Sequence, residues 1–271
     1  QQQQQQQLHV SLSAHMQLQE KYLSNLVLAA NDRGDSGEYP GLMFVSDHLN
    51  SKGPQDPHQR DIIGKLCVAT ARDSIAESLR KHDDSLTLKV YVDASHHGAN
   101  HDACLFIFGP NGDVKQITVE IKTGSPKQDR LNTWVFKNIA LSAPSNDSTP
   151  ANDLYVLLGL FHRASLPKSL SSPDVCYQPF QRVHILTGAS ILQAYKEQHG
   201  GNLPSRKVDM PITLTTASAK PGWGSKAAQA TGNQTLEFAP RGQTTLRPQL
   251  PAKDVVGQAI VDVLRTSGLL G

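Results

Sequence analysis

Leu86–Asp93 (LTLKVYVD), Ala103–Phe108 (ACLFIF) and Val114–Ile121 (VKQITVEI) are the part of the sequence that decides the fold. The first two runs are rich in apolar residues, and the third alternates with a period of two, which is typical of a strand. Between the second and third runs lies GPNGD, residues 109–113, where proline presets φ and Asn-Gly tolerates a positive φ. We therefore expect three strands, of which the last two form an antiparallel hairpin.

Downstream of the hairpin, the pattern changes to alternating helices and strands. Residues 167–179 and the Gly-, Pro-, Gln- and Thr-rich stretch 220–257 predict loops, the second being the least ordered part of the chain. The remaining predicted elements are a helix at Asn152–Arg163, a strand at Arg182–Thr187, a helix at Ala189–Gln198, a strand at Val208–Thr216 and a closing helix at about Asp254–Arg265. This order favours an α/β fold.

Upstream of the first strand, the chain is expected to be helical. Residues 1–7 are all glutamine and predict a disordered tract. Apolar spacing predicts one helix within residues 8–28 and a second at about Asp61–Arg80. The sequence thus divides into a glutamine tract (1–7), a helical N-terminal segment (8–84) and an α/β domain (85–271).

Composition excludes several classes of protein. The 271 residues carry 26 Lys and Arg against 24 Asp and Glu, a net charge of +2, so bulk electrostatics does not hold a polyanion here. No apolar run approaches the roughly 18 residues of a membrane helix, so no membrane partner is expected. The three cysteines are far apart, and the N-terminus lacks the basic and apolar segments of a secretory signal. We expect an intracellular protein, without distinguishing cytosol, nucleus or organelle.

The segment Val90–Val114 (VYVDASHHGANHDACLFIFGPNGDV) resembles the opening of a ribonuclease H domain of the fungal and retroelement type. The residues that carry the resemblance are Asp93, Ser95, Gly98 and Phe108-Gly109-Pro110-Asn111. The resemblance implies a ribonuclease H-like mixed sheet, with three antiparallel strands followed by β-α alternation.

The same resemblance implies a catalytic site. Asp93, Asp153 and Asp254 take the family's acidic positions and would bind Mg²⁺ or Mn²⁺ to cleave the RNA strand of an RNA–DNA hybrid. Gly188 stands where the family has a further Asp, which argues against full activity. An alternative is therefore a non-catalytic ribonuclease H-like module that serves as a platform for nucleic acid or for protein partners in a larger assembly.

A third hypothesis uses other residues of the hairpin. Asp102 opens one arm, and Glu120-Ile121-Lys122 closes the other, which resembles the Asp…Glu-x-Lys signature of restriction-endonuclease-like nucleases. If the turn centres on residues 111 and 112, Asp102 falls opposite residues 120–122 by cross-strand pairing. The two acids would then bind Mg²⁺, and the lysine would orient or deprotonate water. The plain alternative is that Glu120 and Lys122 are solvent-side residues of an alternating strand.

Overall fold

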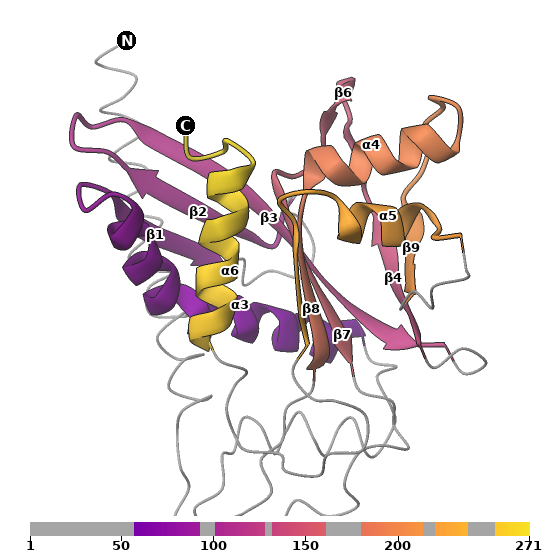
Figure 1. Ribbon diagram of the computed structural model, residues 1–271, viewed down its shortest axis with the longest axis horizontal. Helices are drawn as coiled ribbons and strands as arrows, with labels where there is room; N and C mark the ends of the chain where they lie inside the picture. Colours follow the sequence, from indigo (N-terminus) through magenta and orange to yellow (C-terminus); the bar gives the residue numbers. More distant parts are fainter. Residues whose placement is uncertain (1–56, 93–100, 128–131, 161–179, 214–219, 238–252) are drawn as a thin grey trace, which may run out of the picture.

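The computed structural model describes residues 57–92, 101–127, 132–160, 180–213, 220–237 and 253–271. Within these ranges the elements follow in the order α3 (Pro57–His82), β1 (Thr87–Val92), β2 (Ala103–Phe108), β3 (Val114–Pro126), β4 (Thr133–Ile139), β5 (Ser142–Ala143), β6 (Asn146–Pro150), β7 (Leu154–Leu160), β8 (Phe180–Thr187), α4 (Gly188–Gln198), β9 (Val208–Thr213), α5 (Trp223–Gln229), β10 (Gln234–Glu237) and α6 (Lys253–Thr266). The result is a mixed α/β fold with a mostly antiparallel sheet (Figure 1).

The main sheet has the strand order β1-β2-β3-β7-β8-β10. Strands β1, β2 and β3 are antiparallel neighbours, as the sequence predicts, whereas β3 and β7 run parallel. Strand β3 is long enough to leave this sheet at its far end, where Ser125 and Pro126 pair with β4, which in turn pairs with β9. β3 therefore links β1 and β2 on one side to β7 and β4 on the other.

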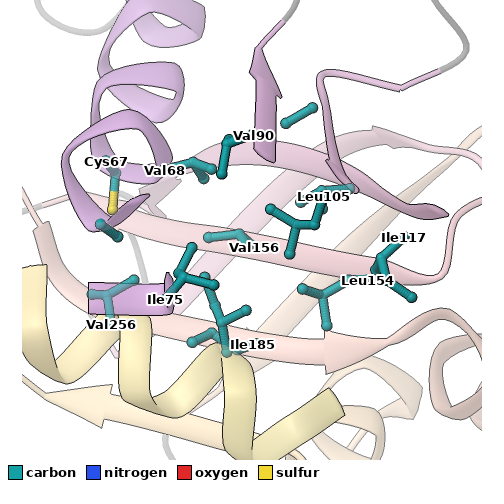
Figure 2. Packing of buried hydrophobic residues seen from close by; sticks show 14 of the residues in the cluster. Cys67, Val68, Ile75, Val90, Leu105, Ile117, Leu154, Val156, Ile185 and Val256 are labelled. Carbon is teal, nitrogen blue, oxygen red and sulfur yellow. The ribbon is translucent and has the colours of Figure 1, made fainter. Parts of the chain in front are cut away.

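Helices α3 and α6 cover one face of the main sheet. Their apolar side chains form a core with inward-facing residues of β1, β2, β3, β7 and β8, among them Ile75, Val90, Leu105, Val156, Ile185 and Val256 (Figure 2). The two helices lie close together, since a Cβ added at Gly257 would lie 2.5 Å from Ser74 Cβ. The boundary predicted at residue 85 therefore separates two segments that share one hydrophobic core.

The opposite face of the sheet is covered only in part by described elements. Over β7 and β8, a second core gathers side chains of α4, α5, β4 and β9, including Trp134, Phe136, Tyr155, Leu186, Ile191 and Trp223. Helices α4 and α5 contact β8, and α5 also contacts β9 and β10. On the β1–β2 side of this face, a third and smaller cluster is built on Cys104 and Phe106.

The predicted helix at Asn152–Arg163 is wrong, because the described part of that segment forms strand β7. Leu154, Val156 and Leu158 point into the core below α3 and α6, while Tyr155 and Leu157 point into the second core. A strand buried on both faces is apolar at every position, so its sequence lacks the period of two that marks a half-buried strand.

The β-α alternation expected after the third strand begins only at β8. Strands β4, β5, β6 and β7 come first, and from β8 onward the order is β8-α4-β9-α5-β10-α6. The stretch 220–257, expected to be the least ordered, contains α5, β10 and the start of α6. The predictions for residues 1–7, 8–28 and 167–179 lie outside the described residues. Among the described residues, no helix is both long and apolar enough to span a membrane.

Candidate active site

Strand β3 presents Glu120 and Lys122 on one face and core residues on the other. Successive side chains of a strand alternate between faces, and Ile117, Val119 and Ile121 all lie in the core beneath α3 and α6. Glu120 and Lys122 therefore lie on the opposite face of the sheet. That alternation is what the period of two in VKQITVEI predicts.

Asp102 immediately precedes β2 and lies beside the same part of β3. The hairpin register pairs Ala103 with Val119, and the Asp102 backbone N–H donates to the Val119 carbonyl at 3.0 Å. The Asp102 Oδ2 accepts a hydrogen bond of 2.8 Å from the Ile121 backbone N–H, which belongs to the peptide bond between Glu120 and Ile121. The predicted placement of Asp102 against residues 120–122 is confirmed.

Glu120 and Lys122 form an ion pair, with Glu120 Oε1 lying 2.7 Å from Lys122 Nζ. The Glu120 side chain is 10% exposed and the Lys122 side chain 25% exposed, so both charges are shielded from much of the solvent. A carboxylate this buried requires a charged or hydrogen-bonding partner, since a buried charge without one costs several kcal/mol. Glu120 is therefore not an ordinary solvent-side residue of the strand.

Tyr155 lies beside Glu120 on the neighbouring strand β7. The parallel register of β3 and β7 pairs the two residues, and Tyr155 is fully buried. Burial raises the pKa of the Tyr155 hydroxyl, and the nearby Glu120 carboxylate acts in the same direction. The hydroxyl donates a hydrogen bond to the Ala140 carbonyl. Tyr155 thus stays neutral and limits the access of water to Glu120 from the β7 side.

The donor chemistry at this place fits a hard divalent cation. Carboxylate oxygens are ligands that Mg²⁺ and Mn²⁺ prefer, and Mg²⁺ is often held by one or two carboxylates together with water and substrate phosphates. Asp102 and Glu120 supply two such groups. Within the described ranges, no group of three or more His, Cys, Asp or Glu side chains is placed to hold a metal ion. Asp102 and Glu120 would serve as ligands of such a cation.

The ribonuclease H-type set Asp93, Asp153 and Asp254 is only partly described. Asp93 follows the last described residue of β1 and lies outside the described residues. Asp254 lies in the first turn of α6, a helix that packs on the sheet face opposite Glu120, and its side chain lies outside the described part. The convergence of these three carboxylates stays a prediction.

Asp153 precedes a strand and not a helix, which corrects the local structure expected for it. Its Oδ2 accepts hydrogen bonds from the Thr118 N–H at 2.9 Å and the Thr118 Oγ1 at 3.1 Å. Its own N–H donates to Thr118 Oγ1 at 3.0 Å. The pair joins β3 to the chain just before β7, two residues from Glu120. This reciprocal contact, which the sequence does not signal, gives Asp153 a structural role.

Gly188 begins α4, and its lack of a side chain has a steric reason. A Cβ placed at residue 188 would lie 1.9 Å from the Asn152 carbonyl oxygen and 2.8 Å from Pro150 Cβ. The Gly188 N–H donates to the Asp153 carbonyl at 2.9 Å, which holds the two segments together. An aspartate at this position has no room without a shift of the backbone.

Comparison of the chain with protein-family models, with curated proteins and with solved structures finds no match. The function must therefore be inferred from the geometry of the site itself.

Proposed function

We propose that the protein is a metal-dependent nuclease of the restriction-endonuclease-like type, in which Asp102, Glu120 and Lys122 act on a phosphodiester bond. The observation that carries the proposal is the contact of the Asp102 carboxylate with the peptide bond of Glu120, while Lys122 lies 2.7 Å from Glu120 on the same strand. The two acids supply ligands for a cation, and the amine supplies a group that orients the attacking water.

The three side chains have separate tasks in this proposal. Asp102 and Glu120 hold Mg²⁺ or Mn²⁺, which when bound polarises the phosphate and lowers the pKa of water. Lys122 orients the attacking water or stabilises charge on the phosphate, since an ammonium donates up to three hydrogen bonds. Tyr155 limits water on one side of Glu120, which strengthens the electrostatic interactions there.

Three observations make the ribonuclease H-type site a weaker candidate. The Asp153 Oδ2 accepts two hydrogen bonds from Thr118, and residue 188 has no room for the family's further acid. The helix that would carry the second acid in that family is a strand here. A ribonuclease H-like fold and the cleavage of RNA–DNA hybrids therefore remain the second proposal, which rests on the sequence resemblance.

The direct experiment is cleavage of end-labelled nucleic acid in Mg²⁺ or Mn²⁺. Duplex DNA, single-stranded DNA, RNA and RNA–DNA hybrid are each incubated with the wild type and with Glu120→Gln and Lys122→Met. We expect metal-dependent cleavage of at least one substrate and a loss of about 100-fold or more in each variant, the scale typical of a lost acid–base group. Asp147→Asn and Lys89→Met, at exposed residues, are the matched controls and keep wild-type rates.

Two outcomes would contradict the proposal. Cleavage that survives Glu120→Gln but is lost in Asp93→Asn supports the ribonuclease H-type site. No cleavage of any substrate in either metal leaves the non-catalytic platform for nucleic acid or protein partners, which is then tested by measuring binding of the same four labelled substrates.

A further inference from the structure

The Lys122 amine neutralises the Glu120 carboxylate and lies where a metal ion bound to Glu120 would also lie. Its Nζ lies 2.7 Å from Glu120 Oε1, which is the distance of a strong charge-assisted hydrogen bond. The Asp102 Oδ2 accepts a hydrogen bond from the backbone N–H of Ile121. One acid therefore accepts a backbone hydrogen bond, and the other forms an ion pair with the amine of a lysine.

We propose that Lys122 and a divalent cation compete for the Glu120 carboxylate, so that Lys122 sets the metal affinity of the site and is released from Glu120 when the metal binds. This inference rests on the proposed function. Asp102, Glu120 and Lys122 together carry a formal charge of −1, and metal affinity falls when the negative charge of the ligands is reduced. A second cation close to the metal also opposes binding by repulsion.

The exposure and the length of the Lys122 side chain favour its release from Glu120. The Lys122 side chain is more exposed than that of Glu120, 25% against 10%, and its amine ends a flexible four-carbon stem. Glu120 lies next to the buried Tyr155 in the register and has less freedom. Once released from Glu120 by the bound cation, the Lys122 amine can donate hydrogen bonds to the attacking water or to the phosphate.

The test is a calorimetric titration of Mn²⁺ into the wild type, Lys122→Met, Lys89→Met and Glu120→Gln, without nucleic acid. Competition predicts that Lys122→Met binds Mn²⁺ about fivefold to tenfold more tightly than the wild type, since Glu120 no longer has to give up an ion pair before it binds the metal. Lys89→Met, at an exposed lysine of β1, keeps the wild-type affinity. Unchanged or weaker binding in Lys122→Met overturns the inference.

A second measurement uses the wild-type protein alone, in case Lys122→Met fails to fold. An amine-reactive ester is added with and without Mn²⁺, and peptide mass spectrometry compares labelling of Lys122 with that of Lys89. Release from Glu120 predicts faster labelling of Lys122 with Mn²⁺ and no change at Lys89. Equal or slower labelling of Lys122 contradicts the competition.

The Mn²⁺ titrations separate an absence of competition by Lys122 from an absence of the metal site itself. If Mn²⁺ binds the wild type and Lys122→Met equally, and Glu120→Gln abolishes binding, the metal site stands and only the competition is wrong. If Mn²⁺ binds neither the wild type nor Lys122→Met, both proposals are wrong.

Discussion

The Asp102 Oδ2 accepts a hydrogen bond of 2.8 Å from the backbone N–H of Ile121, the residue between Glu120 and Lys122. This contact joins the start of β2 to the functional segment of β3. It places a carboxylate beside the peptide bond of Glu120. The hairpin register therefore places Asp102 next to Glu120.

Asp102→Asn and Asp102→Ala separate the structural and chemical parts of this contact. The asparagine oxygen still accepts from Ile121, so we expect Asp102→Asn to fold normally yet to lose metal binding and cleavage. Asp102→Ala also loses the hydrogen bond, and we expect it to lower the free energy of unfolding by about 1 to 3 kcal/mol. Urea denaturation and Mn²⁺ titration measure the two effects. Wild-type cleavage by Asp102→Asn would contradict the role of this acid.

Asp153 is expected to be important for stability and not for catalysis. Asp153→Ala removes the acceptor of two hydrogen bonds from Thr118 and is expected to lower the free energy of unfolding by about 2 kcal/mol or more. Asp153→Asn keeps an acceptor oxygen and should retain cleavage. Cleavage assays on the asparagine variant decide the matter, because the ribonuclease H-type site requires its activity to disappear while its fold remains.

Gly188 is expected to tolerate no side chain. Gly188→Ala would force a Cβ against the Asn152 carbonyl, and we expect it to lower the free energy of unfolding by about 3 kcal/mol. Gly222→Ala is the matched control, because a Cβ there meets no atom within 4 Å, and its effect should stay below about 1 kcal/mol. Similar stabilities of the two variants in thermal or urea denaturation would show that the backbone around Gly188 shifts at little cost in free energy.

His184 is expected to make stability depend on pH. It is buried in β8, with Nδ1 2.9 Å from Thr235 Oγ1, and burial lowers its pKa to about 3, with the Arg182 cation acting in the same direction. Above its ordinary pKa of about 6.5 the ring is neutral in both states, so pH has no effect through it. As the pH falls from about 6.5 towards 3, only the unfolded state binds the proton, and stability falls by up to about 1.4 kcal/mol per unit.

Comparison of the wild type with His184→Gln tests this pH dependence. Urea denaturation between pH 7 and pH 4.5 should give a smaller loss of stability per pH unit in the variant, because the other titrating groups are common to both proteins. Equal slopes would mean that His184 is protonated in the folded state.

The first hairpin could be predicted from the sequence, and with it the candidate site. The Gly-Pro-Asn-Gly-Asp turn and the alternation of β3 are local signals, and counting outward from the turn places Asp102 against residues 120–122. Strand β7 could not be recognised, because it is buried on both faces and its apolar run equally suits a helix. The contact of Asp153 with Thr118 depends on the parallel pairing of β3 with β7, across 35 residues, for which the sequence holds no local signal.

Short strands that are stabilised by pairing with their neighbours could not be predicted from the sequence either. Strand β10 has the polar sequence QTLE, yet it pairs with β8 along its whole length, and Glu237 forms an ion pair with the buried Arg182. Strand β6, with the sequence NDSTP, is nearly all exposed and exists through its pairing with β5. Such strands carry little hydrophobic pattern, so only the folded sheet reveals them.

The most direct test of a metal site at Asp102 and Glu120 is anomalous diffraction from crystals of the wild-type protein soaked in Mn²⁺. We expect an anomalous peak within coordination distance, about 2.0 to 2.6 Å, of carboxylate oxygens of both residues. A peak that instead lies among Asp93, Asp153 and Asp254, with none beside Glu120, would contradict this expectation.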